Sequence, residues 1–370
     1  MKKILALALA LCMIFALAAC GQSAAPAASS TKVAMITDYG DITDQSFNQT
    51  TYEACKAFCE GKGVDFTYFK PASDSDEDRV SMIEKAIDEG YNVIVMPGYA
   101  FAPAIAATAP NYADVTFIAL DVSEYDLTSA GLETLPANLY SAVYQEELCG
   151  YMAGYAAVKL GYTKLGFLGG MAVPAVVRYG YGFVQGADAA AAETGADVSV
   201  KYAYGNQFYG DADITAAMDT WYADGTEIVF ACGGGIFTSA GEAAAKVGAK
   251  VIGVDVDQAA IIDGLYGEGM TVTSAMKGLA ATVNTELAAV LDGKFEGGKV
   301  ENLGLVSEIP EENYVQLAGS TQFGDGFTAD DYAALVADMF AGKVTVSSNT
   351  EVSAADNAKT ITVNDLGNLK

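Results

Sequence analysis

From residue 32 onward, the chain alternates short runs of β-branched and aromatic residues with longer amphipathic stretches. In the first half this pattern predicts strands at residues 33–37, 64–69, 92–96 and 116–120, and helices at 47–61 and 74–89. Strands separated by helices of this length are typical of a parallel sheet whose helices cross over from one strand to the next. The chain is therefore expected to form an α/β fold.

The alternation restarts after residue 144 and produces a second module of similar size. Strands are predicted at 165–168, 198–204, 228–231, 251–254 and 272–275, and helices at 145–160, 180–194, 212–223, 240–247 and 277–291. The tail is richer in turns, with strand-like segments at 344–346 and 360–363.

Two such modules predict two doubly wound Rossmann-like lobes with a central ligand cleft, as in type I periplasmic-binding-protein-like folds, because ligands bind where the carboxyl ends of the strands meet. We expect one lobe to comprise residues 32–144 and about 277–305, and the other residues 145–276 and about 306–370.

The N-terminus resembles a bacterial lipoprotein signal. Lys2 and Lys3 precede an apolar stretch at 4–19 that is shorter than the roughly 20 residues of a membrane span. The stretch ends in Leu-Ala-Ala-Cys, which resembles a lipobox and predicts that residues 1–19 are removed and Cys20 is lipidated. A plain secretory signal with an incidental cysteine is the alternative. Residues 20–31, rich in Ala and Ser, have the composition of a flexible tether.

The composition removes several classes of function. The chain has no histidine, which excludes His-dependent nucleophilic catalysis and histidine zinc sites. With 47 acidic and 20 basic side chains the net charge is -27, so nucleic acids and anionic lipid surfaces repel the protein. Arg79 and Arg178 are its two arginines, so no arginine cluster is available to hold a phosphate.

Polar residues follow several predicted strands and are candidates for a ligand site. Asp121 and Asp255 each come directly after a strand, although a turn-forming aspartate would look the same. Asn48 opens a helix, where it either contacts a ligand through its amide or caps the helix. Gly234 lies in a Gly-Gly-Gly run that permits close backbone approach to a ligand, or simply forms a tight turn.

Several motifs together resemble the basic membrane protein family, the purine nucleoside receptor lipoproteins that serve ABC importers. The first is Asp-Gln-Ser-Phe-Asn at residues 44–48, soon after the first strand. The others are Glu-Leu-Cys-Gly-Tyr-Met-Ala-Gly-Tyr-Ala-Ala at 147–157, Leu-Gly-Phe-Leu-Gly-Gly-Met at 165–171, Gly-Phe-Val-Gln-Gly-Ala at 182–187, Ile-Gly-Val-Asp-Val-Asp-Gln at 252–258 and Thr-Ser-Ala-Met-Lys at 273–277.

The resemblance implies a solute-binding lipoprotein, not an enzyme, that captures a nucleoside between its lobes. Partners would be an ABC permease and ATPase and, through the lipid, the outer face of the cell membrane; no nucleic acid, cofactor or metal is expected. Asp121 would accept hydrogen bonds from the ligand, and Asp255 would bind the ribose hydroxyls with Lys277 offsetting its charge.

Base stacking is assigned to an aromatic residue after the second strand of the second lobe. Phe208 stands there, and the resemblance implies that it stacks on the base. Family members often carry Phe where this chain has Ile42, so we expect either Ile42 or Tyr39 opposite Phe208. Asp44 and Asn48, both in the Asp-x-Ser-Phe-Asn run, complete the predicted ligand-binding set.

Two alternatives remain open at the level of sequence. A sugar or sugar-like signal would suit a cleft of the same fold, because sugars are also bound by Asp, Asn and aromatic faces. In the other, an extracellular glycosidase or nucleoside hydrolase would use the acids Asp38, Asp41 and Asp44, a cluster that is also a candidate for Ca²⁺.

Overall fold

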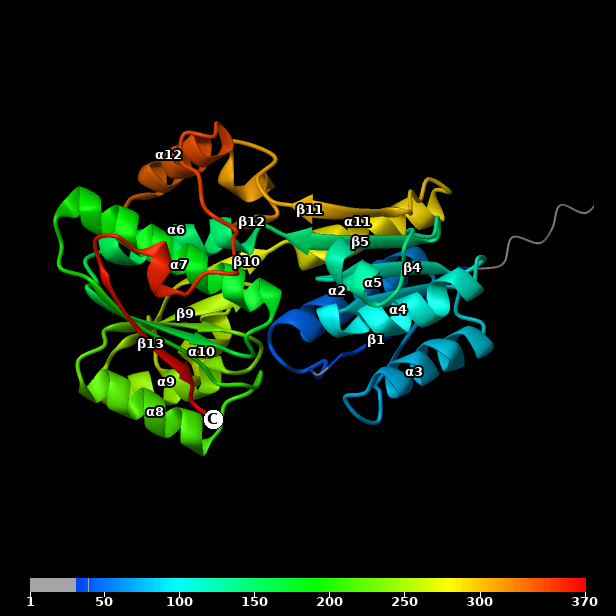
Figure 1. Ribbon diagram of the computed structural model, residues 1–370, viewed down its shortest axis with the longest axis horizontal. Coiled ribbons are helices and arrows are strands. Elements are labelled where there is room, and N and C mark those ends of the chain that lie inside the picture. Colours follow the sequence, from blue (N-terminus) through cyan, green and yellow to red (C-terminus); the bar gives the residue numbers. More distant parts are fainter. Residues whose placement is uncertain (1–30, 39) are drawn as a thin grey trace, which may run out of the picture. The chain divides into compact units, whose positions relative to one another are not determined.

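The computed structural model describes residues 31–38 and 40–370, and two predominantly parallel sheets organise the part from Lys32 to Lys370 (Figure 1). The predicted signal segment, most of the tether, Cys20 and Tyr39 lie outside the described residues. Both sheets are covered by helices on their two faces, so the predicted α/β fold class is confirmed.

The first sheet has six parallel strands in the order β11-β5-β4-β3-β1-β2. They are β1 (Lys32–Ile36), β2 (Asp65–Phe69), β3 (Val93–Pro97), β4 (Thr116–Leu120), β5 (Leu139–Tyr144) and β11 (Lys299–Leu303). One face packs on α2 (Phe47–Lys62) and α11 (Leu279–Leu291), and the other on α3 (Asp76–Asp88), α4 (Ala102–Thr108) and α5 (Glu124–Ser129). Neighbouring residues of β1, such as Met35 and Ile36, therefore enter different cores.

The second sheet has seven strands in the order β12-β10-β9-β8-β6-β7-β13, all parallel to their neighbours except β12. They are β6 (Lys164–Gly169), β7 (Ser199–Tyr204), β8 (Ile228–Cys232), β9 (Lys250–Asp255), β10 (Thr271–Lys277), β12 (Val315–Leu317) and β13 (Thr362–Asn368). Helices α6 (Glu146–Lys159) and α7 (Pro174–Thr194) cover one face, and α8 (Ala212–Ala223), α9 (Phe237–Val247) and α10 (Ala259–Tyr266) the other.

The remaining elements are α12 (Ala329–Phe340) and four short 3₁₀ turns, η1 (Tyr99–Phe101), η2 (Ala109–Asn111), η3 (Pro310–Glu312) and η4 (Ala355–Asn357). Each sheet with its helices forms one lobe. The chain passes between the lobes three times, from β5 to α6, from β10 to α11 and from β11 to β12. Among the described residues, no helix has both the length and the apolar character needed to cross a membrane.

Glycines hold α6 and α7 in backbone contact. A Cβ atom on Gly150 would lie 2.1 Å from the carbonyl oxygen of Tyr179, and one on Gly182 would lie 2.0 Å from that of Glu147. No side chain larger than hydrogen fits in so small a space. The glycines of the motifs at 147–157 and 182–187 therefore serve helix packing, and they bring the start of α7 close to the start of α6.

Most predicted elements occur within a few residues of their predicted bounds, and the exceptions are local. Residues 344–346 form no strand but a loop after α12. Lys277 ends β10 instead of opening the next helix, and α7 begins at Pro174, six residues before the predicted start at 180. The prediction also missed β5, a strand buried on both sides, although the turn-type residues Pro136 and Asn138 come before it.

Candidate ligand-binding cleft

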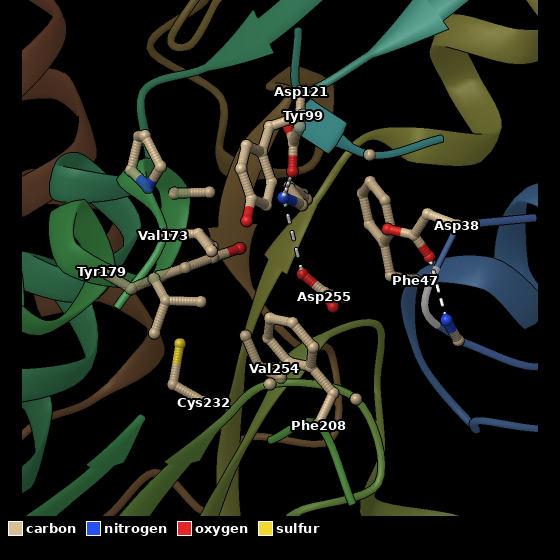
Figure 2. A pocket seen from close by; sticks show the side chains of 18 of the residues that line it. Asp38, Phe47, Tyr99, Asp121, Val173, Tyr179, Phe208, Cys232, Val254 and Asp255 are labelled. Atoms are coloured by element: carbon tan, nitrogen blue, oxygen red, sulfur yellow. Dashed lines mark hydrogen bonds and ion pairs between the residues drawn. The ribbon is translucent and has the colours of Figure 1, made fainter. Parts of the chain in front are cut away.

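A cleft lies where the carboxyl ends of the strands of both sheets face each other (Figure 2). Its cavity volume is about 100 Å³, and it is partly open to solvent. Strands of the first lobe contribute Asp38 and Asp121, and those of the second contribute Cys232, Asp255 and Lys277. This is the position at which doubly wound sheets bind ligands.

Asp121 and Asp255 are held in an uncommon backbone conformation. Asp121 follows β4 with φ 61°, and Asp255 ends β9 with φ 65°. Few residue types other than glycine adopt this left-handed region, and Asp and Asn are the most tolerant of them. The turn at each strand end aims its carboxylate into the cleft, in equivalent positions of the two lobes.

Lys277 is the charge centre of the cleft. Its ammonium nitrogen Nζ lies 2.5 Å from Asp121 Oδ2, 3.4 Å from Glu146 Oε1 and 3.9 Å from Asp255 Oδ1. Burial disfavours the charged lysine, but the carboxylates prevail and raise its pKa above the ordinary value. Its side chain is 3% exposed, so the lysine is a buried internal counter-ion and not a surface residue.

Arg178, near the start of α7, is the second basic side chain among the described residues of the lining. Its Nε donates to Glu146 Oε2 at 2.7 Å, and Glu147 Oε2 lies 4.0 Å away. Burial raises the pKa of Glu147 to about 7. Glu146 therefore bridges Arg178 and Lys277, and both cations of the lining are paired with carboxylates.

Asn48 has a different environment from the one that we predicted. Its amide nitrogen Nδ2 donates to Asp38 Oδ1 at 3.0 Å and to Asp44 Oδ2 at 3.2 Å, so both amide hydrogens are engaged by carboxylates. Its Oδ1 is buried without a hydrogen-bond partner in the described part of the chain. Asn48 lines the cleft, and the side-chain atom that it has available for a ligand is the acceptor Oδ1.

Asp38 and Asp44 are the acids on either side of that amide. Burial raises the pKa of Asp38 to about 6, against hydrogen bonds from Gly40 and Asn48 that lower it. Burial likewise raises the pKa of Asp44, which accepts bonds from the backbone N–H groups of Ser46, Asn48 and Gln49. Asp44 thus shapes the loop before α2 as well as lining the cleft.

Among the described residues, four aromatic side chains line the cleft, namely Phe47, Tyr99, Tyr179 and Phe208 (Figure 2). Of the two residues that we expected opposite Phe208, Ile42 is not among the lining residues, and Tyr39 lies outside the described residues. Phe47, from the first turn of α2, lines the cleft instead, and Lys277 Nζ lies 4.7 Å from its ring centroid. The sequence predicted a helix at 47–61, and Phe47 was assigned no part in the ligand site.

Gly233 and Gly234 provide the space for Phe208. They have φ 146° and 53°, and a Cβ on Gly234 would lie 2.7 Å from the carbonyl oxygen of Phe208. Gly235 donates its backbone N–H to that same oxygen at 2.8 Å. The glycine run therefore leaves room for Phe208, and Gly234 also lines the cleft.

Two hydrogen bonds connect the lobes beside Asp255. Ser46 Oγ donates to Asp255 Oδ2 at 2.5 Å, and Gln258 Nε2 donates to the carbonyl oxygen of Gln45 at 3.0 Å. Both reach from the loop before α2 to the end of β9 and the start of α10. The cleft is therefore closed by direct contacts on this side.

The acids Asp38, Asp41 and Asp44 do not converge on one point. Asp41 is exposed and pairs with Lys70 at 2.5 Å, whereas Asp38 and Asp44 line the cleft. Throughout residues 31–38 and 40–370, no three Cys, Asp or Glu side chains are arranged to hold a metal ion. Asp257 is exposed and accepts from Ser320 Oγ at 2.6 Å, outside the lining.

A sequence model of a protein family described as "Bmp: ABC transporter substrate-binding protein PnrA-like" matches residues 31–317. The chain belongs to this family. A relative from Lactococcus lactis subsp. cremoris, "ABC transporter nucleoside-binding protein BmpA", is 29% identical over 94% of this chain and 99% of its own length. "Basic membrane protein A1" of Borrelia garinii subsp. bavariensis is 28% identical over 82% of this chain and 86% of the relative.

Solved structures show the same fold. The solute-binding protein of an ABC transporter system from Conexibacter woesei superposes with a TM-score of 0.66 at 23% sequence identity, covering 86% of this chain and 99% of that one. The expected type I solute-binding fold is therefore confirmed. The Bmp family match ends at residue 317, so α12, η4 and β13 lie beyond it.

The motifs that carry the resemblance to the Bmp family have identifiable roles in the structure. Asp-Gln-Ser-Phe-Asn at residues 44–48 provides Asp44, Phe47 and Asn48 to the cleft and Ser46 to the contact with Asp255. Glu146, Arg178 and Tyr179 were not predicted as site residues by the sequence analysis, which named Asp38 only as an acid of the hydrolase alternative. Arg178 could have been found, because one of two arginines at a buried helix start needs a carboxylate partner.

Proposed function

We propose that this Bmp family protein captures an uncharged nucleoside, with a purine base, in the cleft and delivers it to an ABC permease. The observation that carries the proposal is the chemistry of the lining. Aromatic faces of Phe47 and Phe208 stand beside the carboxylates of Asp121 and Asp255, while both lining cations are already paired.

Each part of such a ligand has a matching group in the cleft. A base stacked on an aromatic ring gains roughly 1–3 kcal/mol, which Phe208 and Phe47 would supply. The ribose hydroxyls are donors, and the Asp255 carboxylate would accept both of them. Asp121 Oδ1 is buried without a hydrogen-bond partner among the described residues, so it is suited to accept a further bond from the ligand.

The charge balance favours a nucleoside over a nucleotide. Asp38, Asp44, Asp121 and Asp255 line the cleft, and its two cations are engaged by carboxylates. A phosphate would therefore meet repulsion without a free positive partner. The name of the Lactococcus lactis relative, a nucleoside-binding protein, supports the same choice.

The test is a calorimetric titration of the protein after unfolding and refolding, which removes any co-purified ligand. Inosine, guanosine and adenosine are compared with ribose and galactose. Binding of at least one purine nucleoside at one site per chain, with no heat from the sugars, is the expected result. Binding of a sugar without any nucleoside would replace this proposal with the sugar-binding alternative.

A hydrolase of nucleosides is disfavoured because Asp41 pairs with Lys70 at the surface, away from Asp38 and Asp44. Incubation with inosine followed by chromatography tests this point. We expect the nucleoside to be recovered intact. Release of free hypoxanthine at a rate that depends on protein concentration would show an enzyme and contradict the proposal.

We also propose that the protein acts outside the cytoplasmic membrane, tethered by a lipid on Cys20. The support is the sequence alone, in which Leu-Ala-Ala-Cys ends an apolar stretch that follows two lysines. Labelled palmitate should enter the wild type, and a Cys20→Ala variant should lose the label and leave the membrane fraction. Retention of the label by the variant would exclude this anchor.

A further inference from the structure

The loop that carries Phe208 connects β7 to α8 at residues 205–210. At its start, Gly205 and Asn206 donate their N–H groups to the carbonyl oxygens of Gly169 and Gly170, at 2.8 and 3.0 Å. At its end, Asp211 caps α8 by accepting from the N–H groups of Asp213 and Ile214, both at 3.0 Å. The position of Phe208 in the cleft therefore depends on what holds these two ends.

The last residues of the chain contact both ends of this loop. Leu369 donates its backbone N–H to the carbonyl oxygen of Tyr204, the last residue of β7, at 2.8 Å. Lys370 Nζ bonds to Asp211 Oδ2 and lies 3.5 Å from Gln207 Oε1. Figure 1 shows the red C-terminal strand β13 running to this end of the second lobe, beside α8.

Gln207 connects Lys370 to the loop through hydrogen bonds. Its Nε2 donates to the carbonyl oxygen of Tyr209 and to Asp211 Oδ2, each at 2.9 Å. Gln207 and Tyr209 are the two neighbours of Phe208 in the chain. Lys370, Asp211 and Gln207 thus form a polar cluster that is connected to both chain neighbours of Phe208.

The C-terminal strap, residues 362–370, adds little to the core. In β13, six of the seven residues are exposed, namely Thr362 and residues 364–368, and the strand lies at the edge of its sheet. It is held upstream by Asp188 of α7, whose Oδ1 accepts from the backbone N–H groups of Lys359, Thr360 and Ile361 at 2.9, 2.6 and 3.1 Å. The strap also lies outside the region that matches the Bmp family.

We propose that the C-terminal strap holds the 205–210 loop in its ligand-binding conformation, with Lys370 as a positioning residue that acts through Phe208. The proposal rests on the proposed function, since the aromatic face matters only if a ligand stacks on it. A loop that is already ordered loses less conformational entropy when the ligand binds, so the strap raises affinity without touching the ligand.

The test compares Lys370→Ala, Lys370→Arg and a matched control, Lys343→Ala, which removes an exposed lysine paired with Asp338 in the same lobe. Lys370→Ala should weaken inosine binding 3- to 10-fold and leave the melting temperature unchanged. Lys370→Arg should restore the affinity, because arginine also pairs with Asp211, and Lys343→Ala should bind as the wild type does.

A double-mutant cycle with Phe208→Ala tests whether Lys370 affects ligand affinity through Phe208. In the Phe208→Ala background, Lys370→Ala should cost less than twofold in affinity. Wild-type affinity of Lys370→Ala, or the same loss in both backgrounds, would overturn the proposal.

Hydrogen exchange separates this proposal from the proposed function. Amides of residues 205–210 should exchange faster in Lys370→Ala than in Lys343→Ala, with or without a ligand. If the wild type binds no nucleoside, the proposed function fails, and unchanged exchange in this loop would then overturn the strap proposal as well.

Discussion

Asp121 and Lys277 form a buried ion pair across the cleft, with 2.5 Å between Oδ2 and Nζ. Asp121 follows a central strand of the first lobe, whereas Lys277 ends β10 of the second, immediately before the chain crosses back. Glu146, at another crossing, shares the same ammonium group. Lys277 and Glu146, which share an ion pair at the cleft, thus lie next to two of the segments by which the chain passes between the lobes.

Replacement of Lys277 by methionine should destabilise the protein by about 3 kcal/mol, because Asp121 and Asp255 would be left buried without a paired cation, although Glu146 would keep Arg178. Urea unfolding measures the change. Lys343→Met, which removes an exposed lysine with its own carboxylate partner, is the matched control and should change the free energy of unfolding by less than 0.5 kcal/mol. Equal stability of the two variants would show that the buried cluster needs no counter-ion.

Truncation of Phe208 to alanine should weaken nucleoside binding roughly 10- to 100-fold, because one stacked face of the base is lost. Phe47→Ala should have an effect of similar size. Tyr209→Ala is the control, since Tyr209 is 63% exposed and does not line the cleft. Dissociation constants from calorimetry decide the matter, and a loss confined to Tyr209→Ala would contradict the assignment of the aromatic faces.

A 5′-phosphate on the ligand should weaken binding by more than about 100-fold, since both cations of the lining are paired and the remaining groups are carboxylates. The comparison is inosine against inosine 5′-monophosphate. 5′-Deoxyinosine, which lacks the hydroxyl but carries no charge, shows how much of the loss comes from the missing hydroxyl alone. Binding of the monophosphate within tenfold of inosine would mean that the cleft holds a cation for it.

Asp38 should make stability depend on pH between about 4 and 6. Burial raises its pKa from 3.8 to about 6, so the folded state binds a proton more tightly than the unfolded state does. This contribution to stability is complete below pH 4 and is lost as the pH rises through 6. The unfolding free energy of wild type minus that of Asp38→Asn should fall by about 2 kcal/mol from pH 4 to pH 7.

Unfolding curves of both proteins at four pH values test this prediction, and a difference that stays constant from pH 4 to 7 would disprove it. Asp41→Asn is the control. The pKa of Asp41 is lowered, chiefly by its hydrogen bond with Lys70, so its substitution should change stability in the opposite direction with pH.

The sequence predicted the architecture because the periodicity of strands and helices is a local property. Strand β4 and helix α8 have the predicted bounds, and Asp121 and Asp255 occur where the predicted strands end. Short segments without a clear hydrophobic pattern were less predictable. The half-buried β11 and the exposed β13 have mixed sequences, and their pairing with β5 and β7 comes from the tertiary fold.

The cleft was predicted only in part, for a similar reason. Asp44, Asn48, Asp121, Phe208, Gly234, Asp255 and Lys277 all belong to the lining. Which atoms they leave for a ligand is decided by neighbours that no local pattern shows. The amide of Asn48 is oriented by Asp38 and Asp44, and the charge of Lys277 is shared with Glu146.

The left-handed backbone at Asp121 and Asp255 restricts how the specificity of this protein can change. Most side chains are strained at φ 61° and 65°, and β-branched ones most of all, so asparagine and glycine are the replacements that the two turns tolerate best. A mutational library aimed at a new solute would gain little by randomising these positions. Variation at Tyr99 and Phe47, whose backbones carry no such constraint, offers a wider range of viable sequences.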